Sequence, residues 1–441
     1  MFATQVFGRY AAEFTDQALP AEVMHHAKRA VVDWYASAYP GVSREPVRLL
    51  EEVLAEDLDR GSARLILGRA ATARAAAMIN GAAAHAAEVD DSFREAMYHP
   101  GAATIAAALA AAHSTGCNGQ EFLRAVVLGY EVSTRIGIAL GRGHYKYWHN
   151  TGTVGTFGAA AAAGYLLRLS EVQFAHALAT AATFAAGLQQ AFRMDSMSKP
   201  LHPGRAAEGG LLAAQLASRG VTGSLDVLDG AAGFGVAMSA GADWSQVGAT
   251  LGRDFHITRT TFKNHVGCGH SFPSIDGALE LQRVHGFRAD EIDSIHIGTY
   301  KPALDIACYV RPATVNEAQF SIPFVVATAL LHGSVRMAAY EPERLHAPAT
   351  RALMERIHVA VDPELDAGFP GRRSAHVEIV LGDGRRFAHL QPNRKGDPEL
   401  PLTDADLEGK LVEFAAPVIG AGAARALAAR LWTLDTSETL P

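Results

Sequence analysis

Runs of alanine and glycine are the feature of this sequence that most restricts its fold. They fill residues 102–112, 155–164 and 175–187, where larger side chains are sparse. Side chains this small allow the axes of two helices to approach closely, so such runs are typical of helices packed on all sides in a large bundle. The sequence therefore predicts a mainly α protein whose central helices are buried.

One of these runs is apolar enough to be compared with a membrane span. Residues 154–167 contain no charged side chain, but they include three glycines and are followed by Arg168. The run is also shorter than the roughly 20 apolar residues that a span requires. We therefore expect a buried helix here and no membrane contact.

Composition narrows the class of protein. The chain has 441 residues, of which 49% are hydrophobic and 19% charged, so it has enough apolar material for a large core and is expected to form two domains. The net charge is -7. Because binding phosphates requires a basic surface, we expect no nucleic acid as partner.

The cysteines and the first residues of the chain indicate the cellular compartment of the protein. Cys117, Cys268 and Cys308 are far apart and odd in number, which is unlike a disulfide framework. Residues 1–6 lack the basic start and apolar core of an export signal. We therefore expect a cytoplasmic protein.

The sequence pattern is helical up to about residue 255 and changes after Phe262. Helix starts are expected after Pro20, Ser170 and, near the other end of the chain, Thr403. Between residues 263 and 395 apolar and β-branched residues alternate in short stretches, and a Gly-Asp-Gly turn follows one of them. The strands expected there are residues 292–300, 357–361 and 376–381, with helices at 274–285 and 323–332.

These patterns predict two domains of different class. Residues 1–262 and 396–441 are expected to form a large all-helical domain, to which the C-terminal helices return. Residues 263–395 are expected to form a smaller α+β domain of three or four antiparallel strands with helices on one face.

Two short segments concentrate charge in an otherwise apolar chain. Residues 198–205 (Ser-Lys-Pro-Leu-His-Pro-Gly-Arg) and 262–270 (Phe-Lys-Asn-His-Val-Gly-Cys-Gly-His) each combine a lysine with histidine and with proline or glycine. Lysine binds small anions, and histidine transfers protons near neutral pH. The chain has no Walker loop, metalloprotease motif or nucleophile elbow, and residues 267–272 lack the third glycine of a dinucleotide loop. We therefore expect an enzyme that acts on a small, multiply charged anion with its side chains alone.

A set of short motifs in a fixed order covers almost the whole chain. In this order they resemble the MmgE/PrpD family, which includes 2-methylcitrate dehydratase, cis-aconitate decarboxylase and iminodisuccinate epimerase. The resemblance implies a helical domain, an α+β lid domain inserted before the C-terminal helices, a homodimer, and a site in the cleft between domains that uses no organic cofactor and no metal. The motifs are residues 80–85, 89–92, 99–101, 129–132, 148–153, 199–202, 318–321 and 395–398, with Lys263 and Cys268.

The resemblance also implies catalytic residues. Lys199 and Lys263 are expected to hold substrate carboxylates, because an anion that enters a partly dry cleft loses its hydration. Either His99 or His149 is expected to be the base that takes a proton from the carbon next to a carboxylate. Asp91 is expected either to orient His99 or to contact the substrate.

The remaining site residues concern the proton donor and the substrate. A departing group needs a proton, which another histidine, Tyr145 or a protonated carboxylic acid could give. Tyr145 lies in a stretch, residues 143–149, that is dense in aromatic and basic side chains. The residues expected to bind or line the substrate are Glu88, Ser92, His202, Cys268 and His270, where Glu88 occupies a position that is aspartate in many relatives.

The reaction expected first is that of a dehydratase-type lyase on a small di- or tricarboxylate. One alternative is an epimerase of a dicarboxylate such as iminodisuccinate, and another is a carboxylate-binding protein without catalysis. Relatives often have tyrosine at the position of Phe324, whose phenyl ring cannot donate a hydrogen bond. This departure disfavours decarboxylase and methylcitrate-type activities.

Overall fold

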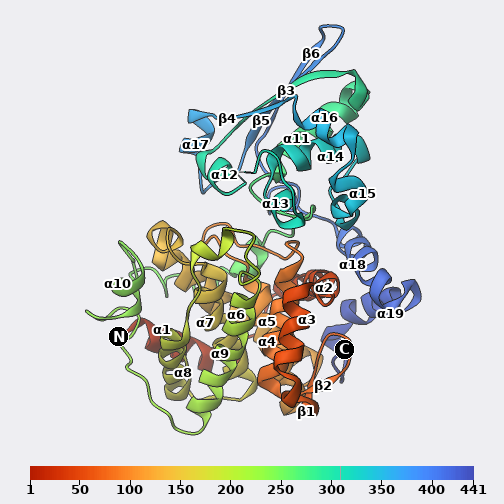
Figure 1. The fold of residues 1–441 in the computed structure, drawn as a ribbon. Coiled ribbons are helices and arrows are strands. Elements are labelled where there is room, and N and C mark those ends of the chain that lie inside the picture. The colour runs from red at the N-terminus through yellow and green to blue at the C-terminus, as the bar shows by residue number, and fades with distance from the viewer. Residues whose placement is uncertain (308) are drawn as a thin grey trace. The chain divides into compact units, whose positions relative to one another are not determined.

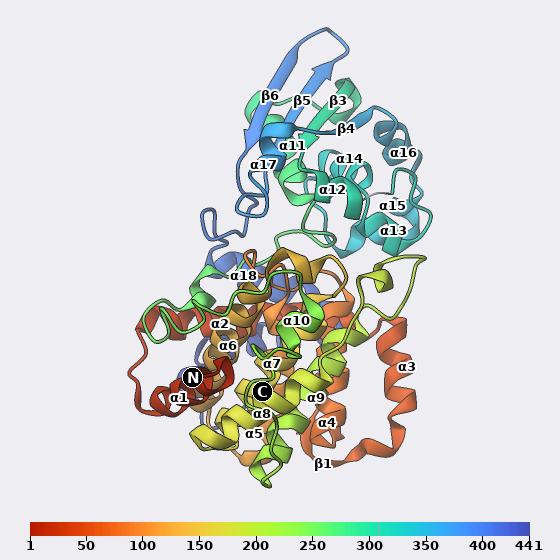
Figure 2. The ribbon, with the colours of Figure 1, turned by 90° about the vertical axis from the view of Figure 1, so that its left-hand side faces the viewer.

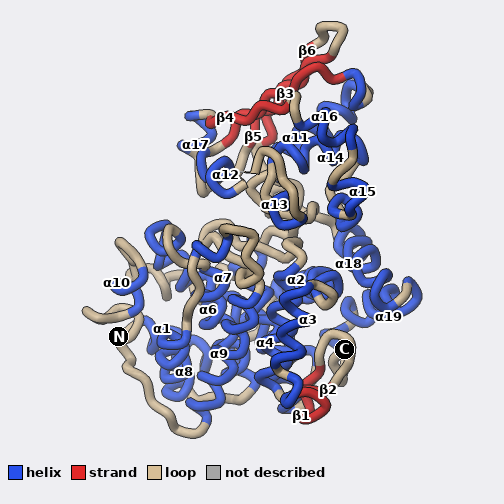
Figure 3. The backbone as a smooth tube through the Cα atoms, viewed as in Figure 1, coloured by secondary structure: helices blue, strands red, loops and turns tan. Residues whose placement is uncertain are grey.

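The structure, a computed structural model, describes residues 1–307 and 309–441, so Cys308 lies outside the described residues. The chain divides into two compact units: residues 1–262 with 403–441, and residues 263–402. The first unit is built almost entirely from helices, and the second combines helices with a small sheet (Figures 1 and 3). The expected fold class, mainly α with a smaller α+β part, is confirmed.

The helical unit contains long helices that lie side by side, as Figures 1 and 2 show from two directions. It also contains a short antiparallel sheet that the sequence did not predict, because its longer strand is mostly polar and exposed and only a few residues pair. The elements are α1 (Ala3–Asp16), α2 (Ala21–Gly41), α3 (Glu45–Val53), β1 (Leu58–Arg64), β2 (Ala70–Ala71), α4 (Ala73–Ala86), α5 (Pro100–Thr115), α6 (Gly119–Tyr145), α7 (Asn150–Leu166), α8 (Glu171–Phe184), α9 (Leu201–Ser218), α10 (Phe234–Met238), α18 (Asp404–Ile419) and α19 (Ala421–Trp432).

Helix α7 is at the centre of this unit and contacts α5, α6, α8 and α9. Its residues 150–164 are all buried. A Cβ added at Gly158 would lie 2.4 Å from the Thr104 side-chain oxygen, and one added at Gly210 would lie 2.5 Å from Ala159 Cβ. The small residues thus permit the close helix packing that the sequence predicted. Over the described residues, no helix is long and apolar enough to cross a membrane.

The expected helix starts are observed. The side chain of Ser170 accepts a hydrogen bond from the third residue of α8, and that of Thr403 does the same for α18. Pro20 directly precedes α2. Ser170 and Thr403 each satisfy an unpaired N–H group of the first turn, and proline has no N–H group to satisfy. Because these effects act within a few residues, helix starts can be predicted from sequence.

The second unit is an α+β unit. Its helix α11 packs on β5 and β6, and α14 contacts α11 and β4. Its elements are α11 (Phe272–His285), β3 (Ile292–Thr299), α12 (Lys301–Ile306), α13 (Val315–Gln319), α14 (Ile322–His332), α15 (Pro342–Leu345), α16 (Pro348–Met354), β4 (Ile357–Val361), α17 (Pro363–Ala367), β5 (Ala375–Leu381) and β6 (Arg386–Gln391).

The sheet of this unit has the strand order β4-β3-β5-β6. β3 pairs with β5 and β5 with β6 in antiparallel fashion, and the Gly-Asp-Gly turn joins β5 to β6 as expected. β3 and β4, however, are parallel. The expectation of antiparallel strands is wrong for this pair, because the long helical connection from α12 to α16 returns the chain to the end of the sheet where β3 began.

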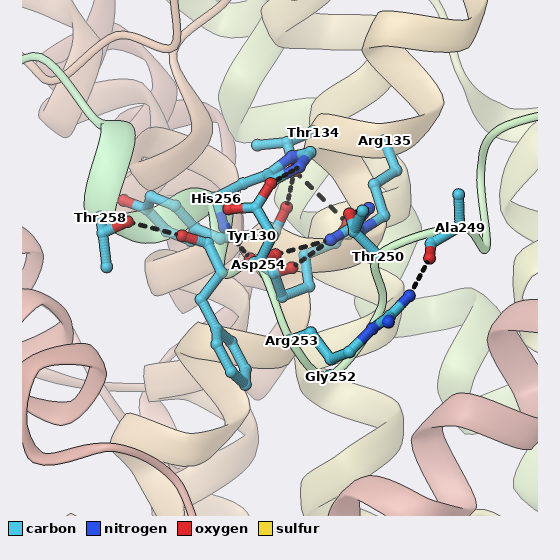
Figure 4. Close-up of polar contacts among 12 residues, drawn as sticks. Tyr130, Thr134, Arg135, Ala249, Thr250, Gly252, Arg253, Asp254, His256 and Thr258 are labelled. Atoms are coloured by element: carbon cyan, nitrogen blue, oxygen red, sulfur yellow. Dashed lines mark hydrogen bonds and ion pairs between the residues drawn. The ribbon is translucent and has the colours of Figure 1, made fainter.

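A buried polar network fixes the segment before the second unit to α6 (Figure 4). Glu131 accepts a hydrogen bond from the His256 backbone N–H at 2.5 Å and one from the Arg135 guanidinium at 3.1 Å. Arg135 also donates to the Thr250 hydroxyl, and His256 Nδ1 lies 2.9 Å from the Thr134 hydroxyl. The network holds residues 250–256, near the point where the chain leaves the helical unit, against α6, the helix that carries Tyr130.

Candidate active site

The loop between α4 and α5 carries both acidic site residues predicted from sequence, Glu88 and Asp91. The backbone of Glu88 is left-handed, with φ of 57°. Ser92 forms an antiparallel bridge with Thr261. Lys410 of α18 donates hydrogen bonds to the Val89 carbonyl at 2.7 Å and to Asp33 of α2. Helix α18 therefore supports this loop directly.

Asp90 joins two histidines from the helices on either side of the loop. Its Oδ2 lies 2.7 Å from Nδ1 of His85, in the last turn of α4, and 3.4 Å from Nδ1 of His99, the N-cap of α5. Nδ1 of His99 also lies 2.5 Å from the Asp91 backbone oxygen. Because oxygen acceptors surround this nitrogen, it carries the proton, and Nε2 of His99 is the nitrogen that can accept one.

Within the described part of the chain, His85, Asp90 and His99 form the group whose possible ligand atoms are close enough to hold a metal ion. One atom each of His85, Asp90 and His99 lies within 4.8 Å of the others. Two imidazoles and a carboxylate form a donor set suited to a transition metal. A cation would have to replace the hydrogen bonds that these Nδ1 atoms donate, so the observed geometry is that of a hydrogen-bonded group.

Asp91 faces the helices next to His99. Its Oδ2 accepts a hydrogen bond from the Tyr130 hydroxyl at 2.6 Å, and its Oδ1 accepts one from the Gly101 backbone N–H at 3.1 Å. Burial, and then the charges of Asp33 and Asp90, raise the pKa of Asp91 to about 8. Its carboxyl group is therefore mostly protonated at neutral pH, and it ties the loop to the first turn of α5.

His149 and His202 form a second histidine pair. His149 is the N-cap of α7, and its Nδ1 lies 2.9 Å from Nδ1 of His202 in α9, so one ring donates and the other accepts. The His149 ring also lies 5.5 Å from that of His85, centroid to centroid. Burial, followed by His85 and His202, lowers the pKa of His149 well below its usual value, and burial, followed by Lys199, lowers that of His202 to about 4. Both rings are therefore neutral at neutral pH.

Lys199 forms an ion pair with Glu88, and only 9% and 10% of the two side chains are exposed. The Lys199 ammonium also lies 5.1 Å from the centre of the Phe192 ring. The same ring packs edge-on against His149, with 4.9 Å between centroids. Phe192 therefore links the lysine to the histidine pair.

Ser92 and Tyr145 differ in their placement. Ser92 is buried, and within the described part of the chain its hydroxyl has no hydrogen-bond partner. Tyr145 is half-buried in the last turn of α6. Its neighbour His144 is buried and contacts the Thr153 hydroxyl at 2.7 Å, so the histidine of this turn fixes the start of α7.

The other predicted residues belong to the second unit. Lys263, Cys268 and His270 are all buried. The Cys268 backbone N–H donates to the Gln319 carbonyl, and His270 Nδ1 lies 3.0 Å from the Tyr300 hydroxyl. The first unit brings together Glu88, Asp91, Ser92, His99, His149, Lys199 and His202, whereas the convergence of Lys199 with Lys263 stays a prediction.

Three neighbours of these residues were not singled out from sequence. His85 ends one of the motifs, and Asp90 lies beside Asp91, so both stood in recognised segments without an assigned role. The signal that could have identified them is a histidine in the last turn of a helix, followed five residues later by an aspartate. Phe192 ends a short 3₁₀ helix, Gln189–Phe192, and carries no comparable signal, because only tertiary packing places it against His149 and Lys199.

Comparison with known proteins supports the resemblance over the full chain. The model of the MmgE/PrpD N-terminal domain matches residues 5–247, and that of the MmgE/PrpD C-terminal domain matches residues 265–435. The chain is 27% identical to the cis-aconitate decarboxylase-like protein oryM of Aspergillus oryzae, over 97% of this chain and 93% of that protein. It is 26% identical to human cis-aconitate decarboxylase, over 100% of this chain and 89% of that protein, and 27% identical to the mouse enzyme, over 83% and 74%. The chain belongs to the MmgE/PrpD family.

Proposed function

We propose that this protein is a lyase that cleaves a bond next to a carboxylate in a small di- or tricarboxylate. The observation that carries the proposal is the geometry of His99. Its Nδ1 faces the Asp91 carbonyl at 2.5 Å and Asp90 at 3.4 Å, which leaves Nε2 as the proton acceptor. An imidazole whose tautomer is fixed in this way is suited to general base catalysis near neutral pH.

His99 is the base in this proposal, and its neighbours have supporting roles. Asp90 and Asp91 orient its ring. His149, kept neutral by burial, is positioned to exchange a proton with the substrate or with His202. The Ser92 hydroxyl, which is buried without a partner among the described residues, is available to donate a hydrogen bond to a substrate oxygen. Donors of this kind stabilise the negative charge that develops when the proton leaves.

Lys199 supplies positive charge for a substrate carboxylate. Because Glu88 already pairs with it, the substrate binds to an ion pair and shares the ammonium group with Glu88. Lys263 is proposed as the second cation, with Cys268 and His270 as lining residues of the substrate. A homodimer is part of the same proposal and rests on the family alone. A proton-donor role for Tyr145 is also proposed, and it rests on the phenol, which can give a proton to a departing group.

The names of the relatives favour decarboxylation, in which a carbon–carbon bond breaks and the product carbon gains a proton. Dehydration is the second candidate. It is favoured by Phe324, which is fully buried in the first turn of α14 and has no hydroxyl group to donate. In dehydration His99 removes the proton from carbon and a protonated group assists the departure of water.

One incubation series tests these reactions against each other. The protein is mixed with cis-aconitate, citrate, methylcitrate and iminodisuccinate in deuterated water, and carbon dioxide, alkene absorbance and deuterium in the recovered acid are measured. Carbon dioxide release indicates decarboxylation, and a rise in alkene absorbance from a hydroxy acid indicates dehydration. Deuterium exchange with inversion and no other change would indicate an epimerase. Binding without any of these changes would indicate a non-catalytic carboxylate-binding protein.

A further inference from the structure

The loop between α8 and α9 covers the histidine pair of the candidate site. The His149 backbone N–H donates to the Gly187 carbonyl at 3.0 Å, and the Gln189 N–H donates to the Tyr147 carbonyl at 2.9 Å. Phe192, in the middle of the loop, contacts the His149 ring. The loop is therefore anchored to the start of α7 at both the backbone and the side-chain level.

This loop and the first turns of α9 line a cavity of about 590 Å³ that is open to solvent. His202 forms part of its wall, and Nδ1 of His202 is 2.9 Å from Nδ1 of His149. The imidazole ring of His202 therefore lies between the cavity and His149, whose ring contacts that of His85, which in turn contacts that of His99. Its lining is mainly apolar and consists of Ala186, Gly187, Leu188, Gln190, Ala191, Arg193, Met194, Ser196, Ser198, His202 and Arg205.

We propose that this cavity, hereafter the loop cavity, binds an alkyl substituent of the substrate. The inference rests on the proposed function and specifies its substrate class as di- or tricarboxylates that carry a chain of several carbons. An unsubstituted six-carbon tricarboxylate has no group that needs such a space. A volume of 590 Å³ lies within the range of about 300–1,000 Å³ that is typical of pockets for larger organic ligands.

The side chains of the loop cavity fit an apolar group attached to an anion. Leu188 and Met194 are 53% and 92% exposed, and an alkyl chain in the cavity would remove part of this apolar surface from water. Arg193 also lines the cavity and, over the described residues, its guanidinium makes no ion pair, so the local charge favours an anionic ligand. Arg205, by contrast, is paired with Glu208.

The test uses succinate, 2-butylsuccinate and 2-hexylsuccinate as probes of the full-length protein, with dissociation constants from calorimetry. We expect the dissociation constant to fall by about fourfold for each added methylene group that enters the cavity. Ala191→Phe, which fills the cavity, is expected to remove this gain for 2-hexylsuccinate and to leave succinate binding unchanged. Met197→Phe, in the same loop but outside the lining, is the matched control and should bind all three acids as the unsubstituted protein does.

The outcomes separate this inference from the proposed function. Equal affinity for succinate and 2-hexylsuccinate, or a loss of both in Ala191→Phe, overturns the loop cavity as a substituent site and leaves the lyase proposal standing. Failure of all three acids to bind also overturns the loop cavity as a substituent site, and the lyase proposal is then decided by the incubation series with cis-aconitate, citrate, methylcitrate and iminodisuccinate. If Ala191→Phe does not fold, Leu188→Trp fills the same cavity from its exposed side and is expected to remove the same gain in affinity for 2-hexylsuccinate.

Discussion

The Lys199 ammonium and the Glu88 carboxylate form an ion pair inside the helical unit, although Lys199, just before α9, and Glu88, in the loop after α4, are more than a hundred residues apart in the chain. Glu88 reaches the lysine from a left-handed backbone position. The lysine that sequence reasoning assigned to the substrate therefore has a partner within the chain. The ion pair with Glu88 is part of the fold, whereas binding of a substrate carboxylate by the same ammonium group is the proposed role.

The first prediction separates these two roles. Lys199→Met leaves the Glu88 carboxylate without its ammonium partner and is expected to reduce the free energy of unfolding by about 3–5 kcal/mol. The double variant Glu88→Gln/Lys199→Met removes both charges and should recover most of that loss while remaining inactive. Urea unfolding and turnover of the best acid are measured on each variant. Full stability in Lys199→Met alone would show that the pair does not support the fold.

A second prediction concerns Asp91 and the pH dependence of stability. The pKa of its carboxyl is about 8 in the folded protein against 3.8 for an ordinary aspartate. The unfolded chain therefore loses this proton first, and the folded state is destabilised as pH rises from about 4 to about 8. Asp91→Asn cannot ionise, so its stability relative to the wild type should rise over this range, by at most about 1.4 kcal/mol per pH unit. Urea unfolding at pH 5, 6, 7 and 8 measures the difference, and parallel curves would contradict the raised pKa.

Buried histidines give the opposite dependence at lower pH. Burial lowers the pKa of His144 and of His202 to about 4. Above about pH 6.5 these rings are neutral in both the folded and the unfolded states. As pH falls from about 6.5 to about 4, the unfolded chain takes up protons that the folded protein excludes, so stability decreases. We expect His144→Asn, although less stable at pH 7.5, to lose less stability than the wild type between pH 7 and pH 4.5. An equal or steeper decrease in the variant would rule out His144 as a contributor.

The role of His99 predicts a kinetic effect without a large change in fold. His99→Gln keeps a side chain that can donate to the Asp91 carbonyl but removes the basic Nε2, so kcat should fall by about 10²–10⁴-fold. Solvent deuterium incorporation into the substrate should fall in parallel. His113→Gln, at the other end of α5, is the control and should retain turnover. Retained activity in His99→Gln would move the base to His149.

The last prediction tests close packing in the helical unit. Gly210→Ala in α9 would place a Cβ 2.5 Å from Ala159 Cβ and 2.5 Å from the Thr156 carbonyl, so we expect a loss of about 1–3 kcal/mol. Gly409→Ala in α18 places its Cβ in open space and should add up to about 1 kcal/mol, because alanine favours the helix. Thermal or urea unfolding of both variants measures the contrast. Similar changes in the free energy of unfolding at the two positions would contradict the close packing of α9 against α7.

The sequence by itself determined the mainly helical class, the helix starts at Ser170 and Thr403, the β5–β6 hairpin and the family. These depend on local signals, namely caps, turn residues, the spacing of small residues and motif order, which act within a few positions of the chain. The sequence also identified most of the candidate site residues, from their side-chain chemistry and their place in the motifs.

Only the tertiary structure decided which atoms of these residues meet. The parallel pairing of β3 with β4, the ion pair between Lys199 and Glu88, and the packing of Phe192 on His149 depend on segments far apart in the chain. The tautomer of His99 and the raised pKa of Asp91 follow from the acceptors and the burial around each group. Such properties come from three-dimensional surroundings that no local pattern encodes, because burial and electric field are set by all neighbours together.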